Sequence, residues 1–429
     1  MMSKFIITNI VAREIIDCRW NPTVQVDVYI NNELKGSGNV PSGRSTGSNE
    51  AFELRDGEKR YGGMGVQKAV SNVNNIIAKE LIGMDVTNQR KIDEVLISLD
   101  ESANKKNLGA NALMPVSLAC AYAAANSLNL PLYRYLNPNA HILPVPLFNL
   151  LNGGKLTSND LDFQEFCIFP TGADSFKHAL EIGRAVNDEL AKIVLEKYGK
   201  LALNVGDEGG FATPITDVFE AMEVLSTAVN NSGYADLIEY GFDCAATHLY
   251  DKERKVYTIQ GKEYDADGIV QFFRDLMKTY PIATIEDPMD EDDVEGFRKI
   301  TQELGIQIVG DDFFCTNPRI MKPKIEKGGA NALLWKFNQV GTLSEAIDAA
   351  SLAYRSGYGV MVSERSGETE DSAIADLVVA LDAGQIKTGA GVRGERTAKY
   401  NRLLQIEEEL GSLARYAGKE YRNTYRVTK

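Results

Sequence analysis

The chain has 429 residues, of which 44% are hydrophobic and 25% charged, enough to bury a large core in two or more domains or in one barrel with an addition. Its formal charge of −14, from 46 basic and 60 acidic residues, argues against a nucleic-acid partner because it supplies no basic surface for phosphates. The five cysteines are far apart and form no CxxC pair, so we expect them to be reduced. Neither a signal peptide nor a membrane-spanning stretch is recognisable, which predicts a cytoplasmic protein without a membrane partner.

The first third of the chain predicts an α+β unit in which strands precede helices. Residues 5–30 alternate between apolar and polar in the manner of strands, and a turn and a third strand follow, which predicts an antiparallel meander. Helical spacing of apolar residues then covers 66–82, 88–98 and 111–127. Three prolines between 138 and 146 mark a boundary, so we predict an N-terminal capping domain over 1–135 and a second domain over 136–429.

Residues 41–49 consist of small, polar and turn-forming types that neither a strand nor a helix favours. They predict a mobile surface loop. Its composition leaves two interpretations open, a plain connector or a lid whose hydroxyls and amides meet an anion or a metal ion.

Most of the remaining chain alternates strand-like runs with helical segments. The stretch 282–338 is the clearest, because three short apolar runs each end in a charged residue and amphipathic segments separate them, as in βαβα units of a parallel sheet. Nine such runs cover 145–150, 162–168, 202–205, 239–243, 282–285, 306–309, 332–335, 359–362 and 385–387. They predict a closed α/β barrel with its reactive groups at the carboxyl ends of the strands.

Charged side chains stand near the ends of these runs, where burial in a parallel sheet costs least. They are Glu165, Glu208, Asp243, Glu286, Asp311, Lys336, Arg365 and Lys387. The three carboxylates Asp243, Glu286 and Asp311 are the oxygen donors that Mg²⁺ prefers. Lys336 ends an apolar run, and we expect nearby cations to lower its pKa and make it a candidate base. For any one of these residues alone, a solvated or salt-bridged rim position is the alternative.

Several short motifs are specific enough to compare with known families. They are Asn21-Pro22-Thr23-Val24, Glu53-Leu54-Arg55-Asp56-Gly57, Gln164-Glu165-Phe166, Val205-Gly206-Asp207-Glu208-Gly209-Gly210-Phe211, Ile285-Glu286-Asp287-Pro288, Gly310-Asp311-Asp312, Ser366-Gly367-Glu368-Thr369-Glu370-Asp371 and Ile386-Lys387-Thr388-Gly389-Ala390. With them the chain resembles the enolases over essentially its whole length. The resemblance implies an enolase-type (β/α)8 barrel under an N-terminal α+β cap, two Mg²⁺ ions per active site, and a homodimer or a multiple of one.

Carried over by position, the resemblance implies how metal and base are arranged. Asp243, Glu286 and Asp311 would bind the first Mg²⁺, and the loop would bring Ser45 to the second. Lys336 would remove the proton α to the carboxylate of a phosphorylated substrate, a pairing of lysine base and Mg²⁺ known for the enolase superfamily.

The same resemblance implies which groups meet the rest of the substrate. Lys387 would stabilise the dianion that forms when the proton leaves. Glu208, assisted by Glu165, would protonate the departing C3 hydroxyl. Arg365 and Ser366 would hold the phosphate.

Two positions of the implied site depart from the family pattern. Leu156 stands where enolases carry a histidine nine residues before the glutamate numbered 165 here, and Glu364 replaces a histidine directly before the phosphate-binding arginine. With Gln164, these positions would line the substrate. None of the three histidines, His141, His178 and His248, occupies either place. Glu364 is expected to add negative charge beside the leaving hydroxyl.

These departures leave two functions open. The first is a divergent enolase, a lyase that interconverts 2-phosphoglycerate and phosphoenolpyruvate. The second is an enolase-like paralogue that applies the same enolate chemistry to a related phospho- or phosphono-carboxylate, as in carboxyphosphonoenolpyruvate synthase, a transferase. The retained metal and base positions disfavour a non-catalytic role.

Overall fold

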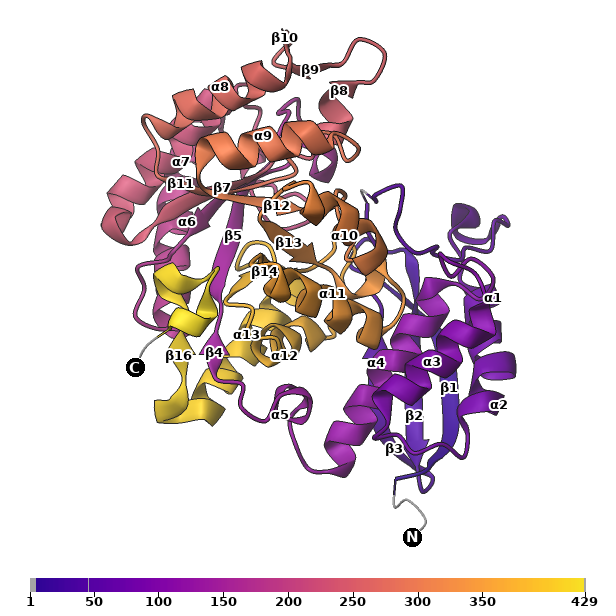
Figure 1. Cartoon of the computed structure of the whole chain (residues 1–429). Coiled ribbons are helices and arrows are strands. Elements are labelled where there is room, and N and C mark those ends of the chain that lie inside the picture. The colour runs from indigo at the N-terminus through magenta and orange to yellow at the C-terminus, as the bar shows by residue number, and fades with distance from the viewer. Residues whose placement is uncertain (1–4, 45, 428–429) are drawn as a thin grey trace.

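The N-terminal part of the protein is a three-stranded sheet backed by helices (Figure 1). In the computed structural model, which describes residues 5–44 and 46–427, strands β1 (Ile7–Ile16), β2 (Pro22–Ile30) and β3 (Glu33–Asn39) pair antiparallel in this order. The predicted antiparallel meander is therefore confirmed. The helices are α1 (Gln67–Asn72), α2 (Ala78–Leu81), α3 (Gln89–Asp100), α4 (Ala110–Ser127) and α5 (Leu132–Leu136).

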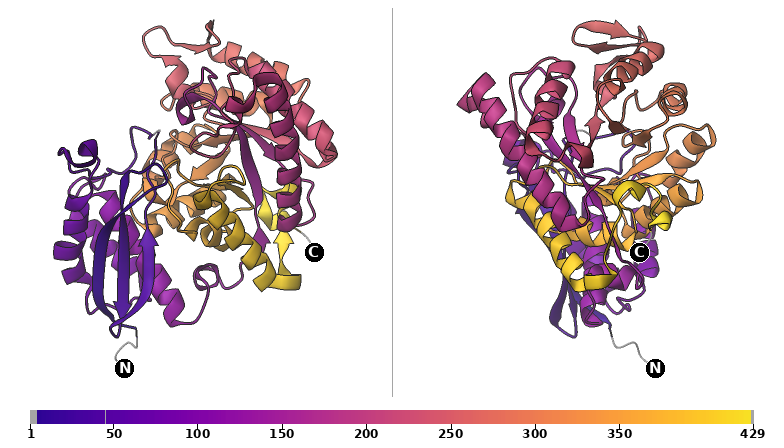
Figure 2. Two further views of the ribbon diagram at one scale, coloured as in Figure 1. Left: turned by 180° about the vertical axis from the view of Figure 1, so that it is seen from behind. Right: turned by 90° about the vertical axis from the view of Figure 1, so that its left-hand side faces the viewer.

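The alanine-rich helix α4 lies directly against the sheet, which faces the viewer in the left panel of Figure 2. Two glycines of β3 permit this approach. A Cβ atom on Gly36 would lie 2.1 Å from the carbonyl oxygen of Ala119, and one on Gly38 would lie 2.8 Å from the nitrogen of the same residue. Backbone contact of this kind leaves no space for any larger side chain.

The C-terminal part contains a closed eight-stranded barrel, as predicted. Its strands are β5 (Val145–Asn152), β6 (Glu165–Phe169), β7 (Glu239–Asp243), β11 (Ile282–Glu286), β12 (Gln307–Gly310), β13 (Ala332–Trp335), β14 (Gly359–Ser363) and β15 (Gln385–Lys387). The barrel closes where β15 pairs with β5. Strand β6 runs antiparallel to both of its neighbours, so the barrel differs from a fully parallel one and the start of β6 lies at the edge where the other strands end.

Helices of the second part surround the barrel (Figure 1). They are α6 (Phe176–Tyr198), α7 (Val218–Ser232), α8 (Ala266–Met277), α9 (Val294–Leu304), α10 (Pro318–Glu326), α11 (Leu343–Arg355), α12 (Ala373–Ala380) and α13 (Gly394–Leu410). A small antiparallel sheet contains β8 (Tyr250–Asp251), β9 (Val256–Ile259) and β10 (Lys262–Tyr264), and β4 (Ile142–Leu143) pairs with β16 (Arg415–Tyr416). No helix of the described residues is long and apolar enough to cross a membrane.

One of the nine predicted strands is wrong. Residues 202–205 do not enter the barrel, because Lys200–Leu203 is a helical turn and Val205 forms only an isolated bridge with Phe211. Leu201 points into solvent, with 82% of its surface exposed. This segment leads instead into the loop that carries Glu208. The division of the chain at residue 135 stays a prediction.

We predict that Gly36→Ala weakens the N-terminal part. The added methyl group would press on the backbone of α4, and overpacking of this kind costs about 1–3 kcal/mol, so the melting temperature should fall. Gly394→Ala is the matched control because a Cβ atom there meets open space. Equal melting temperatures for the two variants would contradict the close packing described above.

Candidate active site

Strand register places three carboxylates at one level of the barrel mouth. Glu165, the first residue of β6, pairs with Asp243 at the end of β7, and Asp243 pairs with Glu286 at the end of β11. Lys387 reaches all three from the end of β15. Its Nζ lies 2.6 Å from Glu286 Oε2, 3.0 Å from Glu165 Oε1 and 3.2 Å from Asp243 Oδ2. All four residues are buried.

The electrostatics of this cluster are unbalanced. Burial raises the pKa of Glu165 well above its usual range, and Glu208 adds to the rise. Burial also raises the pKa of Glu286, with a further contribution from Asp243. For Lys387 burial lowers the pKa, but the surrounding carboxylates outweigh this effect and raise it. One ammonium thus serves three carboxyl groups, which leaves the site attractive to a further cation.

Lys336 forms a second ion pair at the same mouth. Its Nζ lies 2.5 Å from Asp311 Oδ2, and Gln339 Nε2 donates to the other oxygen of Asp311 at 2.9 Å. Burial lowers the pKa of Lys336, but Asp311 and Glu286 together outweigh this effect and the pKa is raised. The nearest charge in this arrangement is a carboxylate, and the lowered pKa expected beside a metal ion and other cations stays a prediction.

The donor set of Asp243, Glu286 and Asp311 fits a hard divalent cation. All three supply oxygen only, the ligand type that Mg²⁺ takes. The buried Glu286 Oε1 has no hydrogen-bond partner in the described part of the chain, so one acceptor remains available.

Among the described residues, the acidic side chains whose oxygens all lie within 4.8 Å of one another form a different group, Asp287, Asp311 and Asp312. This group shares only Asp311 with the expected metal ligands. Both oxygens of Asp287 accept main-chain N–H groups, from Asp311 and Asp312 at 2.9 Å each. Asp287 therefore stabilises the turn that carries Asp311. Each of its oxygens already accepts a hydrogen bond.

Glu208 reaches the mouth from a loop and not from a strand end. The loop is closed by a hydrogen bond from Gly206 N to the carbonyl of Gly210, 2.8 Å long. Asn149 Nδ2 donates to Glu208 Oε2 at 3.2 Å and fixes the carboxyl group. Gln164 is placed nearby, since its Nε2 donates to Asp243 Oδ2 at 3.2 Å and its buried Oε1 has no partner among the described residues.

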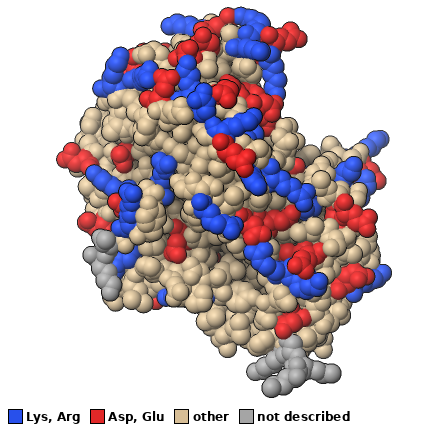
Figure 3. All heavy atoms as spheres, in the orientation of Figure 1, with Lys and Arg blue, Asp and Glu red and all other residues tan. Residues whose placement is uncertain are grey.

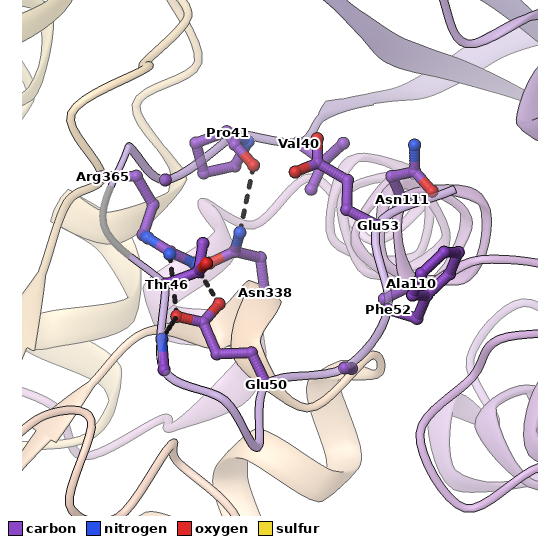
Figure 4. A pocket seen from close by; sticks show the side chains of 13 residues that line it. Val40, Pro41, Thr46, Glu50, Phe52, Glu53, Ala110, Asn111, Asn338 and Arg365 are labelled. Atoms are coloured by element: carbon purple, nitrogen blue, oxygen red, sulfur yellow. Dashed lines mark hydrogen bonds and ion pairs between the residues drawn. The ribbon is translucent and has the colours of Figure 1, made fainter. Parts of the chain in front are cut away.

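Arg365 is held by a glutamate that the sequence did not single out. Its two terminal nitrogens each lie 3.0 Å from an oxygen of Glu50, and Nη1 also donates to Asn338 Oδ1 at 3.1 Å. Figure 4 shows these groups on one wall of a cavity of about 280 Å³. Because Arg365 lines this cavity, an anion that enters it can reach the guanidinium.

The loop 41–49 contacts the site through its described residues, which favours the lid over the plain connector. Arg44 donates its main-chain N–H to Ser366 Oγ at 2.8 Å, and its guanidinium lies 2.8 Å from Asp207 Oδ2. Gly47 N donates to Glu50 Oε1 at 3.1 Å. Ser45, the expected ligand of a second metal ion, lies outside the described residues.

The two departures from the family pattern are both buried. Leu156 contributes its carbonyl, which accepts the N–H of Asp207 at 3.2 Å. Glu364 forms an ion pair with the fully buried Arg396. The negative charge expected at Glu364 is therefore paired with a buried cation. Burial raises the pKa of Glu364, and Arg396 opposes the shift.

Several residues of the site were missed by reasoning from the sequence. They are Glu50, Asn149, Asn338, Gln339 and Arg396. Asn149 left a signal, since it is a polar residue inside an apolar run. The others contact the site from positions whose local sequence has no unusual feature.

Fold and site together define a class of protein, an α/β barrel enzyme with lysines and buried carboxylates at its mouth. The family model "Enolase, C-terminal TIM barrel domain" matches residues 140–425, and "Enolase, N-terminal domain" matches residues 7–136. The chain belongs to the enolase family.

Relatives named enolase match this chain over nearly their whole length. The enolase of Pyrococcus furiosus is 57% identical over 430 residues, which cover 99% of this chain and 100% of that protein. The enolase of Thermococcus kodakarensis is 56% identical with the same coverage. That of Methanocaldococcus jannaschii is 54% identical over 423 residues, 98% of this chain and 99% of the relative.

We predict that Glu50→Gln makes the melting temperature of the protein depend on inorganic phosphate. Arg365 would lose its buried counter-charge, and removal of one partner from a buried pair costs about 3–5 kcal/mol. Inorganic phosphate in the adjoining cavity should replace part of this charge and raise the melting temperature of the variant more than that of the parent.

The control for this prediction is Glu53→Gln. Glu53 lines the same cavity but pairs with Arg55. If phosphate raised the melting temperature of both variants equally, the pairing of Glu50 with Arg365 would not govern anion binding.

Proposed function

We propose that this protein is a Mg²⁺-dependent enolase that interconverts 2-phosphoglycerate and phosphoenolpyruvate, by removal of the proton α to the carboxylate and loss of the C3 hydroxyl. The observation that carries the proposal is the buried group of Glu165, Asp243 and Glu286 around Lys387, in a chain that belongs to the enolase family over its whole length. The paralogue that would use a phosphono-carboxylate is not favoured, because the relatives at 53–57% identity are all named enolase.

The metal would be held by the three oxygen donors at the ends of β7, β11 and β12. Asp243, Glu286 and Asp311 would bind one Mg²⁺, and Ser45 would join a second ion. When bound, Mg²⁺ acidifies the α-proton of the substrate, stabilises the charge that develops on the carboxylate, and offsets the carboxylate charge that raises the pKa of Lys336.

Side chains on two sides of the barrel mouth carry out the proton transfers. Lys336, at the end of β13, takes the α-proton, and Lys387 stabilises the dianion that results. Glu208 delivers a proton to the departing hydroxyl, oriented by Asn149 and assisted by Glu165. The raised pKa of Glu165 supports this assisting role, because it favours the protonated form of a carboxyl group beside the proposed acid.

The remaining contacts hold the substrate. Arg365 and Ser366 bind the phosphate under the lid, and Gln164 offers its unpartnered Oε1 beside Asp243. Leu156 and Glu364 line the substrate at the two positions where the family pattern has histidine.

The organisation of the protein follows from the same assignment. Residues 1–135 form the cap with its lid at 41–49, and residues 136–429 form the catalytic barrel. The partner is a small phosphorylated carboxylate, and the chain assembles as a homodimer or a multiple of one in the cytoplasm. The interspersed basic and acidic side chains on the face in Figure 3 support the proposal that no nucleic acid is bound.

The direct test is dehydration of 2-phosphoglycerate, followed by the absorbance of phosphoenolpyruvate. We expect measurable product with Mg²⁺, loss of activity with a chelator, and recovery when Mg²⁺ is restored. No product at saturating Mg²⁺ would overturn the proposed function and return the paralogue to consideration.

We predict that Lys336→Ala abolishes exchange of the substrate α-proton with solvent deuterium while Mg²⁺ still binds, since the ammonium is not a metal ligand. General-base catalysis commonly contributes about 10²- to 10⁴-fold. Lys105→Ala is the control, because Lys105 is a buried lysine that is also paired with a carboxylate, Glu345 at 3.0 Å. Exchange at the parent rate in Lys336→Ala would mean that another group is the base.

A further inference from the structure

Glu364 is held through its main chain and through one of its two carboxyl oxygens. Its main-chain N–H donates to the carbonyl of Lys387 at 2.9 Å, so it extends the pairing of β14 with β15. Its Oε2 pairs with Arg396 and accepts a hydrogen bond from Thr388 Oγ1 at 3.2 Å. The buried Oε1 has no partner among the described residues. This carboxyl group therefore acts on other protein groups, chiefly on Arg396.

Arg396, in α13, connects two main-chain segments of the active site. Its Nη1 donates to the carbonyl of Arg365 at 2.8 Å, and its Nη2 donates to the carbonyls of Ser366 at 2.8 Å and Asp207 at 3.0 Å. One guanidinium thus holds the segment that carries the phosphate-binding groups and the loop that carries Glu208. The planar fork of arginine is suited to such simultaneous hydrogen bonds.

The space around this connection is filled. The carbonyl of Glu208 accepts the N–H of Ala390 at 2.9 Å. A Cβ atom on Gly389, whose φ is +76°, would lie 2.5 Å from the oxygen of the same carbonyl and 2.9 Å from Glu364 Oε1. Only glycine fits between these groups, so a shift of Arg396 or Glu364 is transmitted to the loop of Glu208.

We propose that Glu364 is a positioning residue for the reaction: through Arg396 it fixes the phosphate-binding segment and the Glu208 loop relative to each other. The inference rests on the function proposed above, because that assignment gives Arg365, Ser366 and Glu208 their roles. Glu364 is the nearer carboxylate partner of this guanidinium, since Glu395 Oε1 lies 3.5 Å from Arg396 Nε. Without the acceptor at Glu364, the buried charge would keep its carbonyl partners and only this more distant carboxylate, and loss of one partner of a buried ion pair is strongly destabilising.

The location of the connection determines which step it affects. Arg396 holds the phosphate and acid side, whereas Lys336 stands on β13 and is fixed by Asp311. A change at Glu364 should therefore slow loss of the C3 hydroxyl more than removal of the α-proton, and raise KM for 2-phosphoglycerate. A residue that only stabilised the fold would lower both rates together.

The experiment compares Glu364→Gln with a matched control. The control is Asp376→Asn, because Asp376 is also buried and also pairs with an arginine of α13. Its oxygens lie 2.8 Å from Nε and 3.0 Å from Nη2 of Arg402. No group that we assign to the active site takes part in this pair. For each protein with Mg²⁺, α-deuterium exchange and phosphoenolpyruvate formation are measured on 2-phosphoglycerate, together with KM and melting temperature.

We expect Glu364→Gln to reduce product formation about tenfold more than exchange, since small misplacements of catalytic groups cost up to about 10²-fold. Asp376→Asn should leave the ratio of the two rates at the parent value. In an Arg396→Lys background, where the fork is lost, Glu364→Gln should change the ratio little further.

The outcomes separate this inference from the proposed function. An active parent with an unchanged ratio in Glu364→Gln would overturn the positioning role and leave the function intact. A full effect of Glu364→Gln in the Arg396→Lys background would also overturn it, because Glu364 would then act independently of Arg396. A parent that neither exchanges the proton nor forms product would overturn the proposed function, and the inference with it.

Discussion

The ammonium of Lys387 makes the rest of the active site possible. Three carboxylates on adjacent strands could not be buried at one level of a barrel without a cation among them, since the desolvation of each charge is costly. The same lysine ends β15, the strand that closes the barrel against β5. One residue therefore takes part both in the strand pair that closes the barrel, through its main chain, and in the neutralisation of the site, through its side chain.

A second constraint is the reversed direction of β6. Because this strand starts at the mouth, Glu165 reaches the site from the beginning of a strand and still pairs in register with Asp243. The long connection from β6 to β7 then has room for α6, α7 and the loop of Glu208. The proposed acid thus approaches from outside the strand ends, while the metal ligands and the base stand on them.

The sequence predicted the architecture well, because each barrel strand is a short apolar run and the functional charges follow such runs directly. It did not predict the direction of β6, since alternation of side chains looks the same in both directions. It took 202–205 for a strand because four residues are too few to distinguish a strand from a helical turn.

The pKa shifts and ion pairs of individual groups could not be predicted from the local sequence pattern. The pKa of Lys336 depends on whether a carboxylate or a cation lies nearest, and sequence spacing does not say which. Glu50 and Arg365 are 315 positions apart, and the sequence around each residue does not indicate that the other is its partner. The sequence singled out residue 364 as a departure from the family pattern, but it did not indicate the pairing with Arg396, which lies on the later helix α13.

The closing pair β5–β15 also has a consequence for how the chain folds. It joins residues near 146 to residues near 386, and β4 pairs with β16 from still farther along the chain. Such non-local pairings slow folding, because a long loop must close before its contacts form. During synthesis the first barrel strands therefore emerge long before their last partner, with their apolar edges open to other chains. Lys387 is among the last residues needed, so the carboxylate cluster meets its cation only when the barrel is complete.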